Sequence, residues 1–108
     1  MVADRAAGED ATLPEPQRAT ELLDQLAGEL AVRGLTARLT APAGRVPSLH
    51  VVNPRNSRLA EDVYAAPARD GLWWFWWPWA ERIAADDDLP SAAALIVKVL
   101  GTKDRAHG

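Results

Sequence analysis

A run of aromatic residues in the second half of the chain constrains the fold more than any other feature. Residues 72–79 read LWWFWWPW and contain all five tryptophans of the 108-residue chain. Asp70-Gly71, directly before the run, favours a hairpin turn because these residues tolerate positive φ. Tryptophan and phenylalanine favour a pleated, half-buried surface. The run is therefore predicted to be a β-strand whose successive rings point to opposite faces of a sheet.

Helical patterns flank the strand region on both sides. Apolar residues recur at helical spacing over residues 13–33, after a capping-box sequence at Thr12 to Glu15 and before a glycine stop at Gly34. Residues 89–100 show a second amphipathic pattern, and Asp86-Asp87-Asp88 places acidic groups at the positive end of its dipole. The sequence therefore predicts one helix before the strands and one after them.

Between the helices the apolar period changes to two. Residues 35–40 and 49–52 alternate apolar and polar side chains on either side of a turn, and residues 59–66 do the same after a loop at 53–57. Residues 79–83 either continue the aromatic strand past Pro78 or form a short fifth strand. The prediction is an α+β fold of order α-β-β-β-β-α, in which a four-stranded antiparallel meander has both helices packed on one face.

Length and composition predict one domain and no redox or metal cofactor. Residues 12–101 are predicted to form a single α+β domain, with a disordered N-terminal arm at 1–11 and a flexible C-terminal tail at 102–108. The chain has no cysteine, which removes disulfides and thiol chemistry. Three adjacent aspartates at a helix start indicate a cap and lack the alternating spacing of a calcium loop.

Charge and hydropathy argue against nucleic-acid and membrane partners. The net charge is −3, and the basic residues are scattered, whereas nucleic-acid binding needs a positive stripe. No apolar run approaches the roughly 20 residues that span a bilayer, and residues 1–12 do not resemble a secretory signal. The sequence therefore predicts a cytoplasmic protein.

The length of the turn before the aromatic strand decides which rings face the helices. A two-residue turn at Asp70-Gly71 pairs Arg69 with Leu72, and this register places Tyr64 opposite Trp77. The residues predicted to face the helices are then Val63, Ala65, Trp74 and Trp76. The residues predicted to form a binding surface on the uncovered face are Arg38, His50, Tyr64, Trp73, Phe75, Trp77 and Trp79. A turn one residue longer would exchange the two sets of rings.

The predicted binding surface favours a non-enzymatic protein-interaction module. Several large rings on an uncovered face form an apolar patch of the size that marks an interaction site. A homodimer or a complex with another protein would cover it, and self-association is the preferred form. The alternative function is small-molecule binding, with a tryptophan-lined site for a flat aromatic or cationic ligand. All rings would instead lie in the core if one helix covered each face.

Enzymatic function has weaker support in the sequence. His50 shares a predicted strand face with Ser48, but no nucleophile motif surrounds the serine. Glu61, Asp62 and Glu81 could supply a pair of carboxylates, although no spacing requires it. Solvated or structural roles are the simpler interpretation of these residues, and no catalytic residue is assigned.

Residues 70–83, DGLWWFWWPWAERI, are followed by ADDDL and an alanine-rich helix. This half of the chain, with the loop at Asn53-Pro54, resembles a family of small uncharacterised actinobacterial proteins. The arginine-rich and alanine-rich composition is consistent with a GC-rich source. The resemblance implies no activity.

Overall fold

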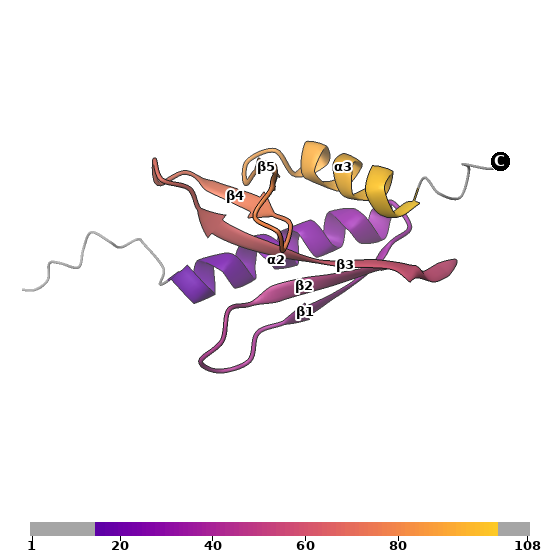
Figure 1. Ribbon diagram of the computed structural model, residues 1–108, viewed down its shortest axis with the longest axis horizontal. Coiled ribbons are helices and arrows are strands. Elements are labelled where there is room, and N and C mark those ends of the chain that lie inside the picture. The colour runs from indigo at the N-terminus through magenta and orange to yellow at the C-terminus, as the bar shows by residue number, and fades with distance from the viewer. Residues whose placement is uncertain (1–14, 102–108) are drawn as a thin grey trace, which may run out of the picture.

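The computed structural model describes residues 15–101 as two helices and a five-stranded antiparallel sheet (Figure 1). The elements in chain order are α2 (Glu15–Val32), β1 (Thr36–Thr40), β2 (Ser48–Asn53), β3 (Asn56–Pro67), β4 (Trp73–Trp76), β5 (Arg82–Ala85) and α3 (Leu89–Gly101). The predicted N-terminal arm, C-terminal tail and Thr12 cap lie outside the described residues.

The strands form a meander of order β1-β2-β3-β4-β5, in which every neighbouring pair is antiparallel. This confirms the predicted α+β class and the antiparallel meander. The predicted count of four strands is wrong. A tight turn follows β4, in which the Trp77 amide donates to the Glu81 carbonyl at 2.9 Å. The chain therefore reverses there, and residues 82–85 pair with β4 as the fifth strand.

Both helices pack on one side of the sheet. Helix α2 contacts β1, β2 and β3, while α3 contacts β2, β3 and β5, and the two helices contact each other. Their buried residues join the inward-facing strand residues in one hydrophobic core. The leucines of α2 that were predicted from helical spacing supply a large part of it: Leu22, Leu23, Leu26 and Leu30.

The ends of both helices follow their local sequence. At the end of α2, Gly34 has φ +93°, and the Leu35 amide donates to the Leu30 carbonyl at 3.1 Å. This is the Schellman arrangement, in which glycine takes the left-handed position. At the start of α3, an Asp88 carboxylate oxygen accepts from the Ser91 amide at 3.2 Å, as an N-cap residue does.

The turn between β3 and β4 is one residue longer than the two-residue turn that was predicted. The Ala68 amide donates to the Leu72 carbonyl at 2.8 Å, and Gly71, at φ +86°, donates to the Ala68 carbonyl. This pattern is a three-residue loop with glycine in the left-handed position. Tyr64 consequently lies opposite Trp76, and the predicted pairing of Tyr64 with Trp77 is wrong.

The changed register exchanges the two sets of rings. Phe75 and Trp77, which were predicted on the uncovered face, are 0% and 4% exposed in the core. Trp73 also packs against the core, on the same side as Phe75. Trp74 and Trp76, which were predicted to face the helices, lie on the other side. A one-residue slip moves every side chain of a strand to the opposite face, because side chains alternate along it.

Candidate interaction surface

The sheet has one face that neither helix packs against among residues 15–101. Cross-strand pairing places His50 opposite both Arg38 and Asp62, and Trp76 opposite both Tyr64 and Arg82. Residues paired across antiparallel strands share a face. We call this surface the open face; its residues are Arg38, His50, Asp62, Tyr64, Trp74, Trp76 and Arg82. Of the predicted binding residues, it contains Arg38, His50 and Tyr64.

Trp76 occupies the middle of the aromatic half of the open face. Its ring is directly across from Tyr64 on β3, and both residues are partly buried. The Trp76 Nε1 hydrogen is donated to the Ala66 carbonyl at 3.0 Å. The indole is thus held against the sheet by its one polar atom, which leaves its apolar surface to meet solvent or a partner.

Arg82 lies over the two open-face indoles. Its guanidinium carbon is 4.6 Å from the centre of the Trp74 ring and 5.6 Å from that of the Trp76 ring. An irregularity in the β4–β5 pairing between Phe75 and Trp76 brings Arg82 opposite Trp76. These are cation–π distances. Within the described part of the chain, Arg82 forms no ion pair, and its charge is stabilised by the two ring quadrupoles.

The Trp74 indole has an unusual hydrogen-bonding state. Its Nε1 atom is shielded from solvent and has no acceptor among the described residues. A donor in this state costs about 1–3 kcal/mol relative to a bonded one. The cost falls on the residue that Arg82 covers. Among residues 15–101, the aromatic half of the open face thus contains one cation without an ion pair and one unsatisfied donor.

The polar half of the open face is a row across three strands. His50 Nδ1 lies 2.8 Å from Asp62 Oδ1, and both side chains are roughly half exposed. Arg38 is exposed on the other side of His50 and has no ion pair among the described residues. Ser48 forms no hydrogen bond to His50 in this part of the chain. The row therefore supplies charges on an open surface, without an aligned nucleophile.

Trp79 lies outside the open face, in the turn between β4 and β5. Its ring stacks on Trp77 with centroids 5.3 Å apart and an interplanar angle of 7°, and its Nε1 donates to Glu81 at 2.8 Å. It is 54% exposed. The seven aromatic residues do not form a single cluster, because β4 divides its rings between two faces and Trp79 lies beyond the strand.

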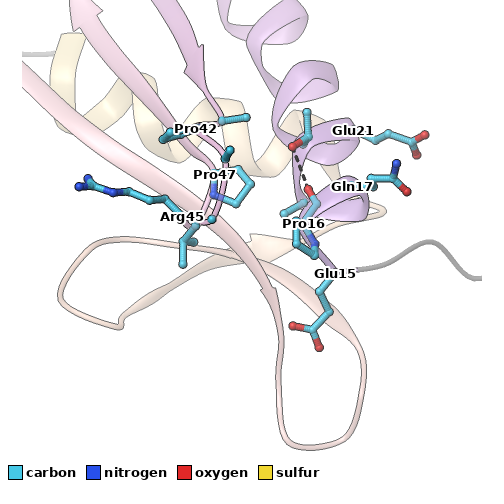
Figure 2. Close-up of a pocket in the computed structure, with 13 residues that line it drawn as sticks. Glu15, Pro16, Gln17, Glu21, Pro42, Arg45 and Pro47 are labelled. Carbon is cyan, nitrogen blue, oxygen red and sulfur yellow. Dashed lines mark hydrogen bonds between the residues drawn. The ribbon is translucent and has the colours of Figure 1, made fainter.

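A shallow groove of about 810 Å³ is present at another place, between the first turns of α2 and the β1–β2 loop. Figure 2 shows Pro16 facing Pro47 across it, while the labelled charged side chains point outward. The Thr20 hydroxyl donates a hydrogen bond to the Pro16 carbonyl at 2.8 Å. The groove is mostly apolar and lacks converging polar groups, which ligand sites use to orient their ligands. The open face is therefore a stronger candidate interaction site than this groove.

Two of the three aspartates before α3 have structural partners. Asp88 caps the helix, and Asp86 forms an ion pair with Arg18 of α2 at 3.1 Å. Among residues 15–101, no group of three histidine or acidic side chains is arranged to hold a metal ion. In the same range no helix is long and apolar enough to cross a bilayer.

Sequence reasoning missed Trp74, Trp76 and Arg82 as open-face residues. The turn length was the signal for the two tryptophans, since a turn one residue longer was recognised to exchange the rings. Arg82 had no such signal, because the irregular pairing that brings it over the indoles leaves no pattern in the sequence. No protein-family model, curated protein or solved structure matches the chain. The resemblance to the actinobacterial family stays a prediction.

Proposed function

We propose that the protein is a non-enzymatic interaction module that binds a second copy of itself through the open face. The observation that carries this proposal is the position of Tyr64, Trp74 and Trp76 on a sheet face that neither helix covers. Aromatic residues and arginine are enriched in the centres of protein interfaces. A face that combines them on a rigid sheet has the composition of a protein-binding surface.

The charges of the open face favour a second copy over an unrelated partner. The face carries two arginines, Arg38 and Arg82, that have no ion-pair partner among residues 15–101, and a half-exposed carboxylate at Asp62. A two-fold contact brings the same patch from both copies together, so a patch that contains both signs can be complementary to itself. A strongly acidic or basic partner would match only part of this face.

The size of the open face predicts a weak dimer. Five strands about 4.8 Å apart make a face about 24 Å wide, and strands of about six residues extend about 20 Å. Each copy would therefore contribute about 500 Å² of flat area, which is at the low end for a specific interface. We expect a dissociation constant in the micromolar range, because only a few central rings supply the binding energy.

Sedimentation equilibrium over a range of protein concentrations tests the proposal. The wild type should show a concentration-dependent dimer, and Trp76→Ala should weaken dimerisation by at least about tenfold, as loss of a central ring does. Trp79→Ala is the matched control, because it removes an exposed tryptophan outside the open face and should leave the dimer unchanged.

Circular dichroism should show that both variants keep the wild-type fold. A wild type that stays monomeric at the highest concentrations would contradict the proposed function. Loss of the dimer in Trp79→Ala with retention in Trp76→Ala would place the interface elsewhere.

Small-molecule binding is a second candidate, and the exposure of Trp79 is the observation that favours it. A flat aromatic ligand could extend the stack that Trp77 and Trp79 begin. A cationic ligand has less support at Trp74 and Trp76, because Arg82 already lies over both rings. Quenching of tryptophan fluorescence by a flat aromatic compound, lost in Trp79→Ala, would support this function.

A further inference from the structure

We infer that Arg82 of one copy forms an ion pair with Asp62 of the other, and that Asp62 of the first copy forms the reciprocal pair with Arg82 of the second. The inference rests on the proposed function, since it names the contacts that select a second copy as the partner. It begins from Arg82, which has no carboxylate partner in the described part of the chain.

Arg82 is exposed, and no acidic group is within ion-pair distance of it in the described part of the chain. The two indoles beneath it hold the guanidinium on the open face. A guanidinium presents several donors in a fixed plane, and stacking on a ring leaves its edge free to bind a carboxylate. Arg82 is thus oriented for an acidic group that arrives from outside the chain.

Asp62 is the one acidic residue of the open face. Its side chain is 42% exposed, and its contact with His50 uses one carboxylate oxygen, Oδ1. The neighbouring acidic groups are directed elsewhere: Glu61 is paired with Val51, whose side chain is in the core, and Glu81 accepts from Trp79 in the β4–β5 turn. If a copy of this chain supplies the carboxylate for Arg82 through its open face, that carboxylate is Asp62.

Two-fold symmetry makes the contact reciprocal, because a residue i that meets j requires that j also meets i. Asp62 lies on β3 and Arg82 lies on β5, with β4 between them. The symmetry axis must pass midway between the two residues, and the open-face side chain of β4 nearest to that point is Trp76. The geometry therefore places Trp76 against the Trp76 of the partner copy, flanked by two ion pairs.

Two charge-reversal variants test this arrangement. Each should lose dimerisation on its own, and a mixture of the two should recover it. Arg82→Asp puts an acidic side chain opposite the partner's Asp62, and Asp62→Arg puts two arginines opposite each other. Each variant should dimerise about 100-fold more weakly than the wild type, because like charges facing each other across an interface are strongly unfavourable. An equimolar mixture should form a heterodimer of near wild-type affinity, because both contacts again join opposite charges.

The measurement uses sedimentation of the mixture, with native mass spectrometry to identify the heterodimer. Arg45→Asp, which reverses an arginine in the β1–β2 loop, is the control partner for Asp62→Arg. Its heterodimer with Asp62→Arg has one Arg82–Asp62 pair and one pair of opposed arginines, so it should recover only about half of the lost binding free energy, or about tenfold in affinity. Arg82→Gln and Asp62→Asn provide a milder pair if a reversal disturbs folding. In that pair, the double variant should lose little more affinity than either single variant, because each single change already breaks both ion pairs.

The outcomes separate this inference from the proposed function. A wild-type dimer whose affinity is insensitive to the single reversals, or whose reversed variants do not recover on mixing, would overturn the pairing of Arg82 with Asp62 and leave the dimer standing. A wild type that remains monomeric would remove the proposed function and the inference with it.

Discussion

The two sides of strand β4 contain similar rings in different environments. Phe75 and Trp77 are buried under the helices, whereas Trp74 and Trp76 lie on the open face and are partly covered by Arg82. On the helix side, a ring is surrounded by apolar side chains. On the open side, it is held by a hydrogen bond to a carbonyl or by a cation. The difference shows that aromatic content alone does not reveal whether a ring supports the fold or is available to a partner.

Removing a ring from the helix side should have the largest effect on stability. Phe75→Ala deletes a fully buried ring and leaves a cavity between β4 and the helices. We expect the free energy of unfolding to fall by about 3–5 kcal/mol. Chemical denaturation followed by circular dichroism measures the change. A loss below about 1 kcal/mol would contradict the assignment of Phe75 to the core.

Removing the matching ring from the open side should cost less. Trp76→Ala loses the cross-strand contact with Tyr64, the interaction with Arg82 and one hydrogen bond to the Ala66 carbonyl. These contributions predict a loss of about 1–3 kcal/mol in the free energy of unfolding of the monomer. Denaturation at a concentration below the dimerisation range gives this value without the contribution of association.

If Trp76→Ala abolishes the dimer but keeps most of the free energy of unfolding, the open-face ring serves binding more than it serves the fold. A loss as large as that of Phe75→Ala would mean that the open-face ring is as important for the fold as the buried one, and the two sides of β4 would not differ as described.

Substitutions in the two turns that flank β4 should change the stability by smaller amounts and with opposite signs. Both have the same hydrogen-bond pattern, but the left-handed position is Gly71 in the first turn and Ala80, at φ +67°, in the second. An alanine in this conformation costs about 1–2 kcal/mol, part of which is offset because glycine has more freedom in the unfolded chain. Ala80→Gly should therefore stabilise the protein by about 0.5–1 kcal/mol, and Gly71→Ala should destabilise it by a similar amount.

Thermal denaturation of both variants measures these shifts, which should have opposite signs. No side chain obstructs a Cβ at Gly71, so the Gly71→Ala effect reports backbone conformation alone. Two shifts of the same sign would contradict the equivalence of the turns.

Local sequence determined the two helices and the first two strands, β1 and β2. Gly34 ends α2 and Asp88 begins α3 because each residue satisfies backbone groups within one turn of the chain. The alternation in β1 and β2 likewise depends only on neighbouring residues. Such features can be read from the sequence because the interactions that decide them are a few residues apart.

Asn53 has a role that the neighbouring sequence could not predict. The sequence around it predicts a loop at 53–57, yet β2 continues to Asn53, which is buried, and β3 begins at Asn56. Its side-chain nitrogen donates to the Leu100 carbonyl at 2.8 Å, and its side-chain oxygen accepts from the Arg55 amide at 2.8 Å. The first partner is near the end of α3, so no pattern near residue 53 could reveal it.

The set of rings on the open face depended on a difference of one residue in the length of a turn. The sequence by itself determined that a pleated aromatic run must send rings to both faces of the sheet, because side chains alternate along a strand. It also determined that both helices could share one side. Only the tertiary structure decided which rings face outward, because Asp70-Gly71 fits both a two-residue and a three-residue turn. That choice depends on packing against residues far along the chain, where Phe75 fills the core beneath the helices and Trp76 does not.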